Sequence, residues 1–234
     1  MKEVVLILSK TQMNNGRVCI GGLTPKGRYV RLLDKQENNQ AENTDLAPRH
    51  GWEIESDEHK DNVPPHVEDI IVHSKIGKGT LKDGITIKDF IEERNIPIWR
   101  GHPDGLFDRL IQWTPNGNGY IDKEVGIPNH SVGFWISDKD LKRKDYKGVR
   151  YQYPTSGGWR NIKFKGLEEP VDTIPLGTLV RVSLARWHSG LLMRRRAKNA
   201  GYNFQDGMII HNIICQHCTT KKSCEKARYR KIII

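Results

Sequence analysis

The sequence contains no long hydrophobic run, and this absence excludes a helix that spans a membrane. No stretch approaches the roughly 18–20 consecutive apolar residues that a bilayer requires. The opening MKEVVLILSK is too short for the core of a signal peptide and lacks a small-residue cleavage site, so it predicts a first strand. We therefore expect a cytoplasmic protein that does not contact a membrane.

The common catalytic motifs are also missing. The chain has no G-x-S-x-G, H-E-x-x-H or complete P-loop pattern. Residues 77–80, GKGT, lack the upstream glycine of a phosphate loop and predict a turn. His102 with Asp104, or His66 with Glu68, could form a general base, but their spacing does not require it. We predict no catalytic residue, and a nuclease or nucleotide-processing enzyme is the alternative.

Cysteine is scarce, and its placement favours a metal site over disulfides. Cys19 stands alone, whereas the other three cysteines lie within ten residues of one another, in a chain without a signal sequence. Two thiolates separated by two residues bind one tetrahedral ion well. The predicted zinc ligands are Cys215, Cys218, Cys224 and His211. His217 and Cys19 are alternative fourth ligands, and an iron–sulfur cluster is the alternative cofactor.

Acidic and basic residues are distributed unevenly along the chain. Residues 1–130 carry 17 Lys and Arg against 20 Asp and Glu, about −3, within a formal net charge of +10. Residues 131–234 carry 21 against 8, about +13. A basic second half predicts a polyanionic partner, of which nucleic acid is the commonest. A basic but solvated surface is the alternative.

Glycine and proline are abundant, at 22 and 11 residues, and predict many turns between short strands. Within residues 1–80, turns at 14–16 and 25–27 separate runs of strand character and predict a first antiparallel barrel. Residues 34–66 are polar and acidic and predict a long mobile loop. This loop is a candidate surface for a protein partner.

The rest of the chain divides into three predicted segments. Residues 81–130 predict a connector with one capped helix over 86–94. Residues 131–187 alternate apolar and polar side chains in several short runs and predict a second barrel. Residues 188–234 predict a basic tail that contains the cysteine cluster.

Several motifs, in their order along the chain, resemble the bacterial dual OB-domain family. They are GRVCIGG and GRYVRLL near the start, GYIDKEVGIPNHSVGFWISDKDL in the centre, and GGWRNIKFKGLEEPVDTIPLGTLVRVSLARW after it. The resemblance covers about residues 1–187, and residues from 188 onward depart from it. It implies a mainly β protein with two tandem OB-like antiparallel barrels and a short helical insertion. It also implies oligonucleotide binding and carries no catalytic residue.

Aromatic and basic residues occur together on two adjacent predicted strands of the second barrel. OB barrels bind single strands by stacking bases on aromatic rings while cations follow the phosphates. The predicted nucleic-acid-binding residues are Arg150, Tyr151, Tyr153, Trp159, Lys163, Lys165, Arg186, Arg194, Arg195 and Arg196. Alternation places Trp159 and Lys163 outward and Ile162 in the core, although Trp159 at a strand end could also be a core residue.

These observations predict an accessory module that binds nucleic acid without catalysis of its own. Base stacking on aromatic side chains favours single-stranded DNA or RNA. The alternatives are the enzyme described above, acting through the same basic face, and an adaptor that binds a protein through residues 34–66.

Overall fold

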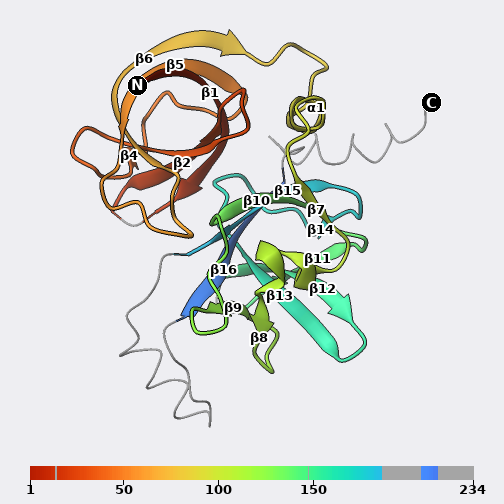
Figure 1. The fold of residues 1–234 in the computed structure, drawn as a ribbon. Helices are drawn as coiled ribbons and strands as arrows, with labels where there is room; N and C mark the ends of the chain where they lie inside the picture. Colours follow the sequence, from red (N-terminus) through yellow and green to blue (C-terminus); the bar gives the residue numbers. More distant parts are fainter. Residues whose placement is uncertain (14, 147, 186–206, 216–234) are drawn as a thin grey trace. The chain divides into compact units, whose positions relative to one another are not determined.

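The chain folds into two compact units in a computed structural model that describes residues 1–13, 15–146, 148–185 and 207–215 (Figure 1). The first unit contains Met1–Pro97, Lys165–Val171 and the described part of Ile214–Ile234. The second contains Ile98–Phe164 and the described part of Asp172–Ile213. No helix among the described residues is both long enough and apolar enough to cross a membrane.

The first unit is a closed barrel of five strands with a short sixth strand at its edge. Its strands are β1 (Lys2–Gln12), β2 (Arg17–Leu23), β3 (Tyr29–Leu33), β4 (Gln40–Ala41), β5 (His50–Glu58) and β6 (Asp69–Thr80). They lie in the order β1-β5-β6-β3-β2-β4, and a further pairing of β1 with β2 closes the ring. β3 and β6 run parallel and the other pairs antiparallel. This order is that of an OB barrel.

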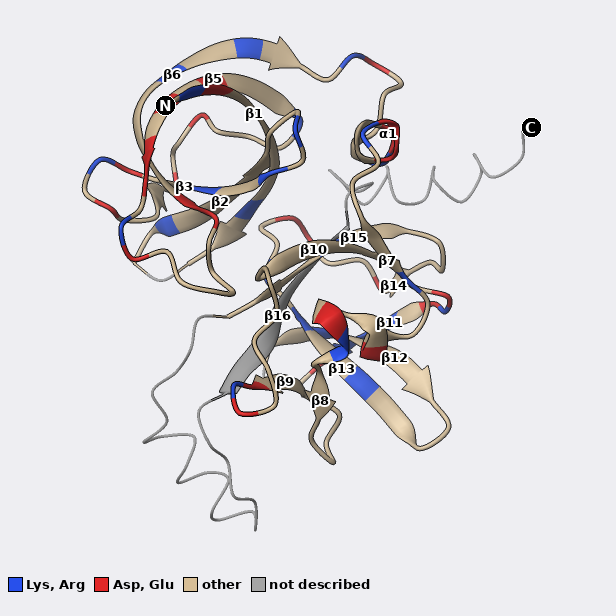
Figure 2. Cartoon of the chain, in the orientation of Figure 1, with Lys and Arg blue, Asp and Glu red and all other residues tan. Residues whose placement is uncertain are grey.

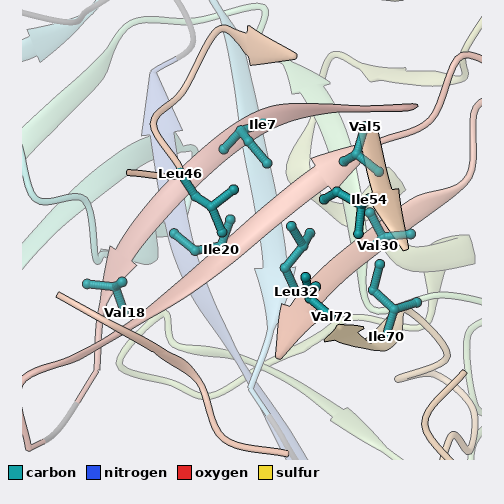
Figure 3. Close-up of a cluster of buried hydrophobic side chains, with 10 residues drawn as sticks. All are labelled: Val5, Ile7, Val18, Ile20, Val30, Leu32, Leu46, Ile54, Ile70 and Val72. Atoms are coloured by element: carbon teal, nitrogen blue, oxygen red, sulfur yellow. The ribbon is translucent and has the colours of Figure 1, made fainter. Parts of the chain in front are cut away.

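The first barrel is filled by side chains of its five long strands, together with Leu46 from the segment between β4 and β5 (Figure 3). The cluster comprises Val5, Ile7, Val18, Ile20, Val30, Leu32, Leu46, Ile54, Ile70 and Val72. Successive side chains of a strand point to opposite faces, so every second residue reaches the interior. Burial of each such side chain contributes roughly 1.5–3 kcal/mol. Alternate residues of these strands therefore form this core.

β1 pairs with two different neighbours along its length. Its first half pairs with β5, and its second half pairs with β2 after a register shift between Ile7 and Ser9. Such a bulge bends a strand and lets it close a barrel. Gly22 faces this bend, where a Cβ would lie 2.3 Å from Val5 Cγ1, so only glycine fits.

The segment 34–66 is not the long mobile loop that its composition predicts. It contains β4 and the nine residues of β5, which pair with β1 and β6. Ile54 and Ser56 are buried, whereas Glu53 and Glu55 face away from the barrel interior. Acidic residues are rare in strands, but here Glu53 forms ion pairs of 2.8 Å with Lys2 and 3.0 Å with Lys78.

The helix α1 (Ile87–Glu93) confirms the predicted helical insertion. Its capping box is complete, since Thr86 Oγ1 accepts the Asp89 N–H at 3.0 Å and Asp89 Oδ2 accepts the Thr86 N–H at 2.7 Å. Ile87 and Ile91 are buried on one face. The helix belongs to the first unit.

The second unit is a larger sheet that contains the second OB barrel. Its strands are β7 (Ile98–Arg100), β8 (Gln112–Trp113), β9 (Gly119–Asp122), β10 (Val132–Ile136), β11 (Leu141–Asp145), β12 (Val149–Thr155), β13 (Gly158–Phe164), β14 (Thr173–Ile174), β15 (Leu179–Leu184) and β16 (Gly207–Cys215). Two short 3-10 helices, Pro103–Gly105 and Phe107–Arg109, precede β8. The order is β14-β11-β12-β13-β16-β15-β10-β7, and β9 joins β8 to β16.

The first strand of this OB barrel is divided into β10 and β11. β11 pairs with β12 and β10 pairs with β15, and only residues 137–140 separate the two halves. β12, β13, β15 and β16 are then the second, third, fourth and fifth strands. β13 and β16 run parallel, as β3 and β6 do in the first barrel. Both barrels therefore have the same strand order.

Two predicted boundaries differ from those of the compact units. Residues 98–130, expected in a connector, supply β7, β8 and β9 to the second unit. β7 lies parallel to β10. The Trp99 ring packs directly on Gly133, where a Cβ would lie 2.2 Å from Trp99 Cζ3. Residues 207–215, expected in the tail, form β16, which lies between β13 and β15. The remainder of the predicted tail lies outside the described residues.

Candidate nucleic-acid interface

The second and third strands of the second barrel, β12 and β13, present one polar face and one buried face. Tyr151 and Tyr153 are each 1% exposed, and Ile162 is fully buried beside them. Tyr153 Oη donates to Asp138 at 2.9 Å, and burial together with this hydrogen bond raises the pKa of Tyr153 far above its usual value. The proposed stacking role of both tyrosines is therefore wrong, because their rings belong to the core.

The opposite face carries three cations in one row across three strands. Lys144 on β11 is directly opposite Arg150 on β12, which is directly opposite Lys163 on β13. Directly paired residues share a face, and like charges so placed destabilise a sheet, by roughly 0.2–1 kcal/mol per pair. Neither Lys144 nor Arg150 forms an ion pair with a carboxylate among the described residues. The row is therefore a concentrated site of positive potential.

The guanidinium of Arg150 is held in place by neutral groups. Arg150 Nη1 donates to Asn118 Oδ1 at 2.5 Å, and Nε donates to the Tyr146 carbonyl oxygen at 3.1 Å. A guanidinium has five N–H donors, so these two bonds leave three for another acceptor. Because both partners are uncharged, Arg150 keeps its full positive charge.

A second row of polar side chains lies beside the cations. Lys142, Gln152 and Asn161 are opposite one another on the same three strands. Gln152 Nε2 donates to Asn161 Oδ1 at 2.9 Å, and Asn161 Nδ2 donates to the Asn116 carbonyl at 2.7 Å. These bonds fix the amides on the face.

The turn between β8 and β9, residues 114–118, packs along β13 and forms part of this face. The Asn161 N–H donates to the Gly117 carbonyl at 2.6 Å, and Asn118 forms a bridge with Asn161. A Cβ on Gly117, whose φ is +73°, would lie 2.0 Å from the Trp159 carbonyl oxygen. The turn can approach β13 this closely only with glycine at that position.

Exposed aromatic rings occur at both ends of this polar face. Trp159, opposite Pro154, is 50% exposed, and Tyr146 before β12 is 60% exposed. Trp159 is thus not a core residue, which was the alternative considered from sequence. On β12, Pro154 is four residues after Arg150, so Trp159 lies about 13 Å along the strand from the cation row. The face therefore carries cations, and exposed aromatic rings lie at Trp159 and Tyr146.

The other predicted binding residues are not all on this face. Lys165 follows β13 and belongs to the first unit, where its carbonyl oxygen accepts the Gln12 N–H at 3.3 Å. Arg186, Arg194, Arg195 and Arg196 lie outside the described residues.

Sequence reasoning missed Lys144, Tyr146 and Asn118. Residues 141–145 form β11, with Leu141 buried and Lys144 exposed. The sequence LKRKD contains a single apolar residue, so it carries little strand signal. No sequence signal places Asn118 beside Arg150, since they are 32 residues apart.

The predicted metal ligands are only partly within the described chain. His211 and Cys215 lie in β16, and Cys218 and Cys224 lie outside the described residues. The zinc site, with His211 or one of the alternative fourth ligands, therefore stays a prediction. No cluster of three potential ligands occurs among the residues described.

The corresponding region of the first barrel has arginines that are already paired with carboxylates. Arg17 binds Asp34 at 2.6 Å, and Arg31 binds Asp69 through two hydrogen bonds. Asp69 has a side chain that is 2% exposed, and this burial raises its pKa, although the charge of Arg31 opposes the shift. Figure 2 shows blue and red interspersed around this barrel, and blue on β13 of the second unit.

The two histidine pairs considered as general bases are engaged in local structure. Asp104 Oδ1 accepts the Trp113 indole N–H at 2.6 Å, and His102 Nδ1 accepts the Asp104 N–H at 3.2 Å. The Arg160 guanidinium lies over the Trp113 ring at 5.1 Å. His66, 4% exposed, is too buried to meet a substrate. These contacts stabilise the fold.

The fold and this face can be compared with known proteins. No curated protein is significantly similar to the chain. A solved structure described as a murine DNA binding protein bound with ds DNA shares 11% identity over 80% of this chain and 89% of that one, with a TM-score of 0.30. That score is too low to bear on fold or function. The model of the dual OB-containing domain matches residues 2–206, and the chain therefore belongs to the dual OB-containing domain family.

Proposed function

We propose that this protein binds single-stranded nucleic acid through the β11–β13 face of its second barrel, and that it acts by binding, without catalysis. The observation that carries the proposal is the row of Lys144, Arg150 and Lys163 between two exposed aromatic rings. This is the surface on which OB barrels bind oligonucleotides.

The cation row supports a phosphate backbone as the ligand. Stability alone disfavours three neighbouring like charges, so a bound polyanion would relieve their repulsion. Each neutralised phosphate of a single strand contributes a salt dependence of about −0.7 in log affinity per log salt. Three contacts would give a slope of about −2.

The exposed aromatic rings favour single strands over duplexes. A ring stacks on the face of a base, and in a duplex the neighbouring base pairs already cover those faces. Trp159, half exposed at the start of β13, is the best-placed stacking surface. A single strand, with its bases free, can therefore contact both the aromatic rings and the cations of the face, whereas a duplex can contact only the cations.

The two alternative functions are less well supported. For the nuclease, His102 and Asp104 are the strongest candidates for a general base, and both already make structural hydrogen bonds. For the adaptor, several acidic residues of 34–66 are neutralised within the unit, such as Asp45 by Lys75 and Glu58 by Arg28.

The test is a titration of the full chain with fluorescent single-stranded and duplex oligonucleotides at several salt concentrations, with product analysis in Mg²⁺. We expect tighter binding of the single strand, a negative salt slope and intact oligonucleotide. Cleavage would favour the enzyme, equal affinity for both forms would remove the stacking argument, and absence of salt-sensitive binding would overturn the proposal.

A further inference from the structure

The turn 114–118 positions a side chain for the proposed ligand, although Asn118 is 32 residues before Arg150 in the chain. Its Asn118 accepts a hydrogen bond from Arg150, the central cation of the row. We propose that Asn118 is a positioning residue that orients the Arg150 guanidinium to bind one phosphodiester group. This inference rests on the proposed function.

The geometry around Arg150 supports this assignment. An arginine restrained at two nitrogens, Nη1 by Asn118 and Nε by the Tyr146 carbonyl, presents its remaining donors in a fixed direction. A planar guanidinium binds phosphate through two parallel N–H bonds only when its plane is correctly oriented. Pre-ordering of the side chain lowers the entropy that binding would otherwise cost.

The turn itself is held rigidly against β13, so the position of Asn118 is well defined. Thr114 and Asn118 are joined by two hydrogen bonds, Thr114 N–H to the Asn118 carbonyl at 3.0 Å and Asn118 N–H to Thr114 Oγ1 at 3.1 Å. Gly117 allows the close approach to the Trp159 carbonyl. These bonds use backbone groups of Asn118 and leave its side-chain carbonyl for Arg150.

The neutral partner is itself informative. In the first barrel Arg31 is held by the carboxylate of Asp69, which cancels its charge. Asn118 provides the same kind of acceptor without a charge. The side chain therefore orients Arg150 and leaves it available for an anion.

The experiment is a double-mutant cycle with N118A and R150K, measured by anisotropy of a fluorescent single strand of about 12 nucleotides, within the range of OB site sizes. We expect N118A to weaken binding about tenfold, the effect of one charge-assisted hydrogen bond, with the salt slope unchanged. R150K should weaken wild type similarly, because lysine lacks the fork, and should weaken N118A little further.

N118D distinguishes positioning from simple contact, and it keeps the side-chain shape if N118A does not fold. Its carboxylate should neutralise Arg150 and reduce the salt slope by about 0.7. N129D, at an exposed turn of the same unit, is the control for added negative charge and should leave the slope unchanged. If the wild type binds and N118A binds equally well, or if the effects of N118A and R150K add, this inference alone is overturned. A wild type that does not bind would overturn the proposed function.

Discussion

The two barrels have the same strand order but use their cations differently. In the first barrel Arg17 and Arg31 are each bound by a carboxylate, and Asp69 stands directly opposite Arg31 on the neighbouring strand. In the second barrel Lys144, Arg150 and Lys163 stand opposite one another across three strands. The arginines of the first barrel stabilise the fold through carboxylate partners, whereas the row of the second barrel places like charges opposite one another.

This difference locates the binding surface more sharply than net charge does. The basic second half indicates a polyanionic partner, but it does not show which surface of the protein binds that partner. Cross-strand pairing shows which cations act together, because directly opposed side chains are about 4.5–5.5 Å apart. The comparison predicts that substitution of the arginines in the first barrel lowers the stability of the fold. Substitution of the cations in the second barrel should lower the affinity for nucleic acid.

The largest expected effect is on stability, from Arg31→Ala. It leaves the buried carboxylate of Asp69 without its partner, which should cost about 3–5 kcal/mol. The measurement is hydrogen exchange of β3 and β6, with affinity determined per folded molecule. We expect that affinity to remain unchanged. A loss of affinity without a loss of stability would contradict the assignment of Arg31 to the fold.

The pH dependence of this variant provides a control with a definite sign. Burial raises the pKa of Asp69, and removal of Arg31 should raise it further. A carboxyl group whose pKa is raised by folding stabilises the fold below its unfolded value, and that contribution disappears as pH rises through the folded value. The destabilisation by Arg31→Ala should therefore diminish on acidification from pH 7.

The next effect concerns the cation row. Replacement of Lys144, Arg150 and Lys163 by alanine should reduce the salt slope by about 2 and the affinity at 0.1 M salt by about 100-fold. The control replaces three exposed lysines of the first unit and changes the net charge equally; these are Lys26, Lys35 and Lys82. Equal losses in both triple variants would show that net charge, and not the row, determines binding.

Trp159→Ala should weaken single-strand binding by roughly 1–3 kcal/mol, as loss of one stacking surface does. Because Trp159 is half exposed, we expect little change in the melting temperature. Trp159→Phe should retain part of the affinity. Early melting with unchanged affinity per folded molecule would instead assign Trp159 to the core.

Much of the fold could be predicted from the sequence, because turns and alternation are local signals. Two barrels and the capped helix are confirmed. β5 was missed because its outward residues are acidic, and their cations, Lys2 and Lys78, come from other strands. β16 was missed because residues 186–206 separate it from β15. Pairing between distant segments is not encoded in any local pattern.

The site was predicted less completely, for a related reason. Alternation correctly separated Trp159 and Lys163 from Ile162. It also placed Arg150 and Tyr151 on opposite faces but could not say which face is buried; that depends on the whole barrel. The Asn118 contact depends on a turn from outside the barrel strands, and residue types alone cannot show it.

The smallest expected effect on binding comes from the cysteines after the fifth strand, where the barrels differ again. In the first unit the fifth strand, β6, is followed by α1, whereas β16 ends at Cys215.

If Cys215, Cys218 and Cys224 hold zinc, purified protein should contain about one metal per chain. Cys218→Ser should lower the metal content and leave oligonucleotide affinity unchanged. His211→Ala should act likewise if His211 is the fourth ligand, and His217→Ala should act likewise if His217 takes that place. A visible absorbance would indicate an iron–sulfur cluster, and protein free of both metals, prepared without chelator, would exclude this site.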